Sequence, residues 1–321
     1  MPDKFKNDGQ KAPETLLFCY NFCAMIFVTG GTGFVGEVLV RQLVATGKPV
    51  RVLLRPSPHS PKIPSGVALD VAVSSLQDQR SLRSAMKGVD VIFHLAGAER
   101  QGTRGDLSGV DVEGTRILVE VAAEAGVARI FYLSHLGADR FSAYPVLRAK
   151  ALAESYLVQS GIAYTIFRSS VIFGPGDQFT EPLVYLLRRI PFIFPLPGDG
   201  QSMIQPLWIE DLVTCLMIAL DDETMQRQIY TIGGSETFSF RQTVEILQEK
   251  LSIQRKLVNV PPPYLRFFLF GLGQFFKQFA MSYYALDYLS ADRTCSLDTL
   301  PRQFSLMPAR FTHQLDYLLK S

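Results

Sequence analysis

The chain has 321 residues and a net charge of +2, with 47% of its residues apolar and 19% charged. This balance is typical of a folded globular protein and excludes a largely disordered one. The lysines and arginines are scattered and form no basic stripe for a nucleic-acid backbone, so nucleic acid is not an expected partner. The four cysteines show neither a disulfide framework nor a zinc pattern, which fits a reducing cytoplasm and predicts no metal site.

Residues 1–24 precede the regular part of the sequence. Lys4, Lys6 and Lys11, followed by an apolar stretch, are similar to a secretory signal. That stretch ends in MIFV, however, which the following glycine-rich turn needs as its strand. We therefore interpret residues 1–24 as a disordered extension. No apolar run reaches the roughly 18 to 20 residues that a membrane-spanning helix requires.

From Met25 onward, short apolar runs alternate with amphipathic stretches. Strands that alternate with crossover helices predict a doubly wound α/β fold, in which helices cover both faces of a parallel sheet. Strands are predicted at residues 25–29, 50–54, 67–73, 89–97, 129–134 and 163–168, with helices over 34–47, 110–126 and 148–161.

Three glycines spaced three residues apart follow the first predicted strand, in the sequence TGGTGFVG. Gly30 would form the tight turn, Gly33 would let the backbone approach a pyrophosphate, and Gly36 would let the helix pack closely on the strand. The helix N-terminus would offer its unpaired N–H groups to the phosphates. The order of strand, turn and helix therefore predicts a dinucleotide-binding site.

Arg55 ends the second predicted strand, where NAD-binding proteins carry an acidic residue for the ribose hydroxyls. A guanidinium can pair with a 2′-phosphate through two donors, and Lys62 in the next loop is a second candidate contact. The alternative is a solvated arginine at a strand end. The sequence thus predicts NADP as the cofactor and leaves NAD open.

These motifs resemble, in content and order, the short-chain dehydrogenase/reductase superfamily in its extended or atypical form, which includes epimerase/dehydratase-like and NmrA-like proteins. The resemblance runs from Met25 to about Leu318 and is strongest to the branch of the Rossmann-fold accessory subunit of respiratory complex I, through YLSHLGAD and QPLWIEDL. It implies a Rossmann fold that binds NAD(P). The implied contacts are Gly30, Thr32, Gly33, Phe34, Val35 and Gly36 with the pyrophosphate, Ser75 and Leu76 with the adenine, and Leu95, Ala96 and Gly97 with the nicotinamide ribose.

The resemblance also implies a catalytic serine, tyrosine and lysine, the last two one helical turn apart. Ser134 fits the serine, and Lys150 fits the lysine that also holds the cofactor ribose. Val146 stands four residues before Lys150, whereas Tyr144, six before it, lies about 120° away on a straight helix. Either Pro145 begins the helix and leaves Tyr144 on a loop that still reaches the site, or the proton donor is lost.

Three further residues near these motifs carry weaker expectations. His94 lies in an apolar strand and is expected to be a core histidine. His135 follows Ser134 and is in a position to face the substrate, but a histidine beside a serine makes no triad without a third, orienting group. Asp111 stands where many relatives carry an asparagine, and this exchange removes a hydrogen-bond donor.

Beyond the sequence FGPGD (residues 173–177), the chain is predicted to add a small α/β cap over the carboxyl ends of the strands, where open α/β sheets bind ligands. In it, residues 261–279 hold seven aromatic side chains and only two charged ones. A core helix or the wall of an apolar pocket is expected there, with docking to a membrane or membrane complex as the alternative. The predicted NAD(P)-binding domain comprises residues 25–175 with 207–232, and the cap comprises 176–206 with 233–321.

The predicted function is an NADP(H)-dependent oxidoreductase or epimerase/dehydratase in the cytoplasm. Its small-molecule substrate would present a carbonyl or alcohol and be apolar or nucleotide-linked. The alternative is a nucleotide-binding protein without turnover, such as a redox sensor or an accessory or assembly subunit of a membrane respiratory complex. Ser134 and Lys150 favour the enzyme, and the broken spacing of tyrosine and lysine favours the alternative.

Overall fold

The computed structural model describes residues 24–57, 69–267 and 292–319. The expectations for residues 1–23, for Lys62 and for 268–279 concern parts of the chain outside these ranges. Within the described ranges, no helix combines the length and the apolar character needed to cross a bilayer.

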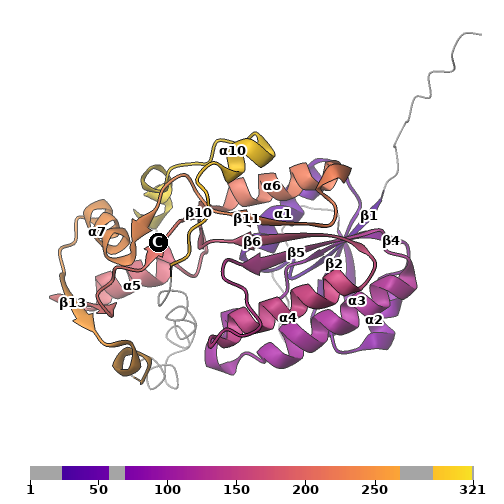
Figure 1. The fold of residues 1–321 in the computed structure, drawn as a ribbon, viewed down its shortest axis with the longest axis horizontal. Helices are drawn as coiled ribbons and strands as arrows, with labels where there is room; N and C mark the ends of the chain where they lie inside the picture. Colours follow the sequence, from indigo (N-terminus) through magenta and orange to yellow (C-terminus); the bar gives the residue numbers. More distant parts are fainter. Residues whose placement is uncertain (1–23, 58–68, 268–291, 320–321) are drawn as a thin grey trace, which may run out of the picture.

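A seven-stranded parallel sheet forms the centre of the molecule (Figure 1). Its strand order is β11-β6-β5-β4-β1-β2-β3. Strands β2 and β3 are added on one side of β1, and the later strands are added on its other side, beginning with β4. The carboxyl ends of β1 and β4 therefore lie side by side at the position where open α/β sheets bind ligands. The doubly wound α/β fold predicted from the sequence is confirmed. The strands span Met25–Thr29 (β1), Val50–Leu54 (β2), Asp70–Val73 (β3), Val89–His94 (β4), Arg129–His135 (β5), Ala163–Ser169 (β6) and Gln228–Ile232 (β11).

Helices cover both faces of this sheet (Figure 1). α1 and α6 cover one face, with the short α10 beside α6, and α2, α3 and α4 cover the other. Because neighbouring side chains of a strand point to opposite faces, Ile26 and Val28 belong to the core under α1 and α6, while Phe27 belongs to the core under α2 to α4. The helices span Phe34–Ala45 (α1), Gln79–Ala85 (α2), Gly114–Ala125 (α3), Pro145–Gln159 (α4), Ile209–Asp221 (α6) and Thr299–Phe304 (α10).

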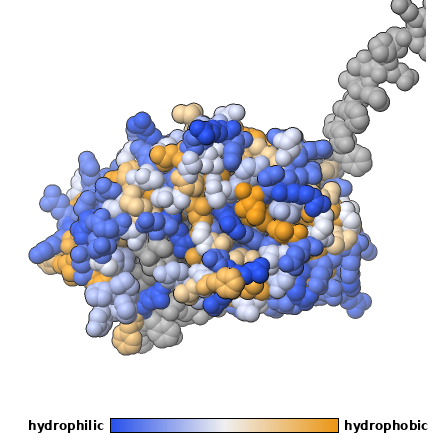
Figure 2. Space-filling model, viewed as in Figure 1, coloured by the Kyte–Doolittle hydropathy of each residue, from blue (hydrophilic) through white to orange (hydrophobic). Residues whose placement is uncertain are grey.

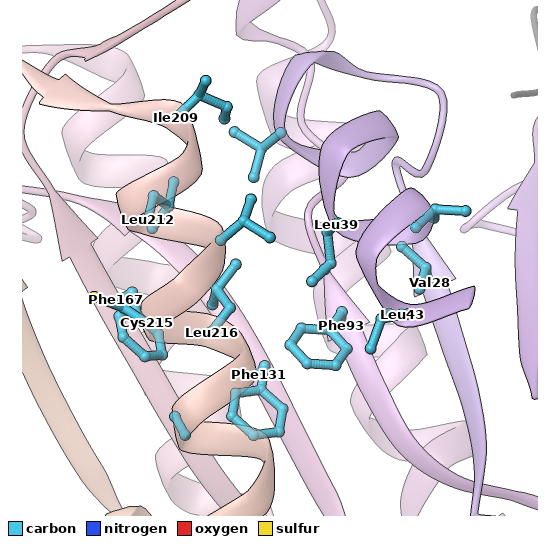
Figure 3. Packing of buried hydrophobic residues seen from close by; sticks show 14 of the residues in the cluster. Val28, Leu39, Leu43, Phe93, Phe131, Phe167, Ile209, Leu212, Cys215 and Leu216 are labelled. Carbon is cyan, nitrogen blue, oxygen red and sulfur yellow. The ribbon is translucent and has the colours of Figure 1, made fainter. Parts of the chain in front are cut away.

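The core under α1 and α6 combines aliphatic side chains of the helices with aromatic side chains of the strands (Figure 3). Phe93 of β4 and Phe131 of β5 stack with their ring centroids 4.5 Å apart. Each fully buried side chain of this kind stabilises the fold by about 1.5–3 kcal/mol, so the core fixes the relative positions of the strands that carry the site. The helix side chains in Figure 3 include Leu39 and Leu43 of α1 and Leu212 and Leu216 of α6.

A smaller lobe with its own apolar core, which corresponds to the predicted cap, lies beside the carboxyl ends of the strands (Figure 1). Residues 207–232 leave this lobe, since α6 packs against α1 and β11 pairs with β6. The lobe and its connections contain α5 (Thr180–Arg189), α7 (Phe240–Leu251), and three strand pairs: β7 (Ile172–Phe173) with β10 (Leu207–Trp208), β9 (Met203–Ile204) with β12 (Phe238–Ser239), and β8 (Ile193–Pro197) with β13 (Lys256–Val260). Short helical segments complete the fold: η1 (Glu99–Arg104), the π-helix η2 (Ser108–Glu113), η3 (Glu223–Met225) and η4 (Phe311–Leu319).

The face of the molecule drawn in Figure 2 is mostly hydrophilic, with apolar residues in small groups. The described part of the aromatic segment, residues 261–267, is mixed: Leu265 is buried, whereas Tyr264 and Phe267 are exposed. Docking of this segment to a membrane stays a prediction.

Candidate functional site

The turn between β1 and α1 is built so tightly that side chains have no room in it. Gly30 has a φ of +73°, and a Cβ there would lie 2.7 Å from the backbone nitrogen of Ala96. A Cβ on Gly36 would lie 2.2 Å from the carbonyl oxygen of Gly30. Gly33 is the N-cap of α1 and offers no side chain to the first N–H groups of the helix. This geometry fits a pyrophosphate, which needs a close backbone and a helix N-terminus with unpaired donors.

Arg55 follows β2 on one side of this turn and is exposed. Its guanidinium reaches the side-chain amide of Gln101 in η1, with donor distances of 3.1 and 3.2 Å when the amide oxygen faces it. Because β2 and β4 flank β1, this contact spans the carboxyl end of β1. Ser75 and Leu76 follow β3 on the same side of the sheet as Arg55.

The segment after β4, which the sequence assigns to the nicotinamide ribose, lies against β1 and against two buried charges. The backbone N–H groups of Leu95 and Ala96 donate to Thr29, at 3.1 Å to its carbonyl oxygen and 3.4 Å to its hydroxyl. A Cβ on Gly97 would lie 3.0 Å from Asp111 Oδ1 and 3.5 Å from Lys150 Nζ. Gly97 therefore leaves these two charged groups directly beside the predicted ribose position.

Lys150 of α4 and Asp111 of η2 form a buried ion pair. Lys150 Nζ lies 3.3 Å from Asp111 Oδ1, and the side chains are 5% and 1% exposed. Asp111 Oδ2 accepts a hydrogen bond from Ala98 N at 2.8 Å, whereas Oδ1 has no hydrogen-bond partner among the described residues. Burial disfavours the ammonium, but Tyr132, Asp111 and Glu99 together favour it more, so the pKa of Lys150 is raised. Lys150 is thus a fixed positive charge.

His94 connects the glycine strand to the same ion pair through a buried chain of hydrogen bonds. Thr115 Oγ1 donates to the carbonyl oxygen of Asp111, so it accepts from His94 Nε2 at 2.9 Å. His94 Nδ1 then accepts from Thr29 Oγ1 at 2.6 Å. Burial, with the charge of Lys150, lowers the pKa of His94 to about 3. The expectation of a core histidine is confirmed.

Comparison with known proteins assigns the chain to a family. The NAD(P)H-binding family matches over residues 30–176. Sterol demethylase protein B of Methylococcus capsulatus is 30% identical over 262 residues, which cover 73% of this chain and 77% of that protein. This chain belongs to the extended short-chain dehydrogenases/reductases, the NAD(P)-binding Rossmann family that includes the epimerases and dehydratases.

Two further proteins are similar to this chain, one in sequence and one in fold. The mitochondrial NADH dehydrogenase (ubiquinone) 1 alpha subcomplex subunit 9 of Arabidopsis thaliana is 29% identical over 242 residues, which cover 74% of this chain. The chain spans 60% of that subunit's length. The structure of UDP-glucose 4-epimerase from Thermotoga maritima, with UDP-glucose, has a TM-score of 0.69 at 19% identity and covers 92% of this chain and 97% of its own. This second likeness shows the shared fold.

The tyrosine of the extended short-chain dehydrogenases/reductases has no direct equivalent on α4. Pro145 is the first residue of α4, three residues before the start of the predicted helix and in agreement with the first of the two alternatives. Val146 is buried in the tyrosine position four residues before Lys150. Tyr144 is the N-cap with extended backbone, and Arg266 of the cap lies over its ring with Cζ 6.0 Å from the centroid. Tyr144 therefore lies at the entry of the helix beside the cap, and its role as proton donor stays a prediction.

Ser134 occupies the family's serine position at the end of β5, but its hydroxyl is engaged. The side chain is buried, and Oγ donates to Glu154 Oε1 at 2.5 Å. Glu154 also forms an ion pair with Arg168, whose Nη2 lies 2.5 Å from Glu154 Oε2. A serine hydroxyl has one O–H to donate. Because that O–H is hydrogen-bonded to a buried carboxylate, it is not available to a carbonyl substrate. The catalytic role of Ser134 stays a prediction, and this bond opposes it.

Two contacts near the site are not evident from the sequence. His135 Nε2 lies 2.8 Å from Glu99 Oε2, with the side chains 17% and 27% exposed. Tyr132 is buried beneath Lys150, whose Nζ lies 5.3 Å from the ring centroid, and its hydroxyl has no partner among the described residues. Asp111 in place of the family's asparagine was a usable signal for the buried ion pair. Nothing in the sequence links Glu99 to His135. No cluster of three metal-ligating side chains occurs in the described part of the chain.

Proposed function

We propose that this protein is an NADP(H)-dependent oxidoreductase or epimerase that acts on a carbonyl or alcohol of an apolar or nucleotide-linked substrate. The buried Lys150–Asp111 pair beside Gly97 is the observation that carries the proposal. A buried ion pair is weak evidence for stability, because apolar side chains of similar volume are often as stable. A fixed ammonium at this position has a chemical use instead: it can hold the cofactor ribose and stabilise negative charge on a reacting oxygen.

The residues of the site have distinct roles in this proposal. Backbone from Gly30 to Gly36 would hold the pyrophosphate, Arg55 would pair with the 2′-phosphate of NADP, and Lys150 would donate to the nicotinamide ribose. When bound, the nicotinamide supplies or accepts the hydride. The absence of a carboxylate at position 55 favours NADP over NAD. His94 is neutral and contributes position, because its two nitrogens are occupied by Thr29 and Thr115.

The substrate class follows from the relatives. One relative is named for a sterol, which is apolar, and one structural neighbour holds UDP-glucose, which is nucleotide-linked. The cap that lies beside the strand ends has an apolar core that includes Phe173, Phe194 and Phe311. These three side chains are buried inside the cap and do not decide between the two substrate classes.

The proposal is tested in two steps with the full chain. Calorimetric titration with NADPH and NADH measures cofactor choice, and we expect NADPH to bind more tightly. Single-turnover oxidation of bound NADPH by a panel of apolar carbonyl compounds, quinones and nucleotide sugars then measures chemistry. A chain that binds neither cofactor contradicts the proposal at its first step. NADPH that binds but survives the whole panel contradicts the enzyme.

The second candidate is a cofactor-binding protein without turnover, in the manner of an accessory or assembly subunit. Val146 in the tyrosine position and the engaged hydroxyl of Ser134 favour it. The similarity to a subunit of mitochondrial NADH dehydrogenase supports the same direction. In that case NADPH would bind without reacting, and the protein would co-purify with a respiratory membrane complex. Membrane contact through residues 261–279 would belong to this role.

A further inference from the structure

We propose that His135, oriented by Glu99, is the residue that gives and takes the proton in the reaction of this protein. The inference rests on the proposed oxidoreductase function. A histidine becomes an effective acid or base when a carboxylate fixes its orientation and balances its charge. The 2.8 Å contact between His135 Nε2 and Glu99 Oε2 provides that orienting group.

The position of the pair matches the place where a proton is needed. Glu99 follows β4 and stands two residues after Gly97, while His135 is the last residue of β5. β4 and β5 are neighbours in the sheet, so both side chains lie at the carboxyl edge where the nicotinamide is expected. Glu99 also contributes to the charge environment of Lys150, which links the pair to the buried lysine.

The burial of the pair suits a proton donor. The side chains of His135 and Glu99 are 17% and 27% exposed, so the pair is not sealed in the core of the sheet. Tyr132, by contrast, is 1% exposed, and burial raises the pKa of its hydroxyl. The Ser134 hydroxyl already donates its hydrogen bond to Glu154.

The reduction step balances with this assignment. The carbonyl carbon of the substrate receives the hydride that reduced nicotinamide supplies, and the electron pair of the C=O π bond moves to the oxygen. That oxygen takes the proton from Nδ1 of the His135 imidazolium, so an alcohol and NADP⁺ are the products. The imidazole, neutral and still hydrogen-bonded to Glu99, then takes a proton from water. Oxidation of an alcohol follows the same path in reverse.

The first test compares single-turnover NADPH oxidation in four variants. We expect H135Q to lower the rate about 10²- to 10⁴-fold, the usual contribution of a general acid, with an NADPH dissociation constant within about twofold of wild type. E99Q should lower the rate by a smaller factor, because glutamine keeps a hydrogen-bonding oxygen but loses the charge. The matched control is H313Q, since His313 is exposed on η4 in the cap. Y144F tests the rival proton donor.

A second readout does not depend on turnover. The chain has four histidines, so the imidazole NMR signals can be assigned by comparing wild type with H135Q and H313Q. Addition of NADP⁺ should shift the His135 signals and leave the His313 signals in place. If the His135 signals do not move, the residue is not beside the cofactor and the inference is overturned.

The outcomes separate this inference from the proposed function. Normal turnover by H135Q, or a loss of turnover in Y144F instead, overturns the role of His135 while the oxidoreductase stands. A wild-type protein that oxidises no NADPH with any compound of the panel overturns both. Loss of turnover in H135Q at unchanged NADPH affinity supports both.

Discussion

The two halves of the site differ in how far they follow the family pattern. In the cofactor half, Gly30, Gly33 and Gly36 build the turn that the motif predicts, and close backbone contacts explain Gly30 and Gly36. In the catalytic half, Lys150 has the family position, but its neighbours differ from the pattern. An aspartate faces it, and Val146 occupies the tyrosine position. The chain thus keeps the family's glycine turn, whereas the side chains around Lys150 differ from the family's pattern.

This difference has a physical cause. A pyrophosphate is bound by backbone N–H groups that must come close to it. The closest positions of the turn therefore require glycine. A proton donor needs only a titratable group at the correct distance, and several side chains on different strands can meet that requirement. The catalytic half therefore tolerates residue replacements that the cofactor half does not.

The largest effect is expected in the catalytic half, from D111N. Asparagine keeps an acceptor for Ala98 N but leaves the Lys150 ammonium buried without a counter-charge, which costs about 3–5 kcal/mol of unfolding free energy. Chemical denaturation measures this change. The control is E113Q, which breaks the half-exposed pair with Arg116 and should cost far less, because solvent screens that pair. Equal effects of the two variants would mean that the Lys150 pair is as solvated as a surface pair.

The next effect concerns His94, which joins the two halves. With a folded pKa of about 3 and an unfolded pKa of about 6.5, the unfolded chain binds a proton that the folded chain does not as pH falls through this window. The stabilisation is complete above about pH 6.5 and declines below it, by up to about 1.4 kcal/mol per pH unit. H94Q lacks this titration and should show a correspondingly smaller slope than wild type, while H313Q should keep the wild-type slope. Parallel curves for wild type and H94Q would refute the buried neutral histidine.

A smaller effect is expected at the edge of the cofactor half, from R55A. Loss of charge-assisted hydrogen bonds of about 1.5–3 kcal/mol should weaken NADP binding about 10- to 100-fold and leave NAD binding nearly unchanged. Calorimetry with both cofactors measures the ratio. The control is R302A, because Arg302 is an exposed arginine on α10, an element without predicted cofactor contacts. An equal loss of affinity for NADP and NAD would remove Arg55 from cofactor selection.

The smallest change, a single methyl group in G36A, tests the backbone of the cofactor half. Its Cβ would meet the Gly30 carbonyl oxygen at 2.2 Å, so the turn must shift, at about 1–3 kcal/mol of unfolding free energy and with weaker NADPH binding. G47A is the matched control at the other end of α1, where no atom lies within 4 Å of the added Cβ. Its positive φ adds about 1–2 kcal/mol of strain, but NADPH affinity should not change. Unchanged NADPH affinity in G36A would place the cofactor elsewhere.

The sequence by itself determined the features that depend on short stretches of chain. Alternation of apolar runs and amphipathic stretches was enough for the doubly wound sheet, because a strand buried on both faces must be apolar at successive positions. The glycine spacing placed the turn between β1 and α1, and Pro145 offered one of two possible starts for α4. Each of these features is local, so each leaves its signal within a few residues.

Only the tertiary structure decided which side chains meet at the carboxyl edge of the sheet. Lys150 and Asp111 are 39 residues apart and meet where α4 packs against η2. Glu99 and His135 are 36 residues apart and meet because β4 and β5 are neighbours in the sheet. Likewise, the sequence placed Ser134 at the end of β5 but did not place its hydroxyl against Glu154 of α4. A side chain's partner depends on the packing of helix against sheet, which periodicity does not specify. That is why the sequence located the cofactor turn, whereas the pairing of charges around the nicotinamide position had to come from the fold.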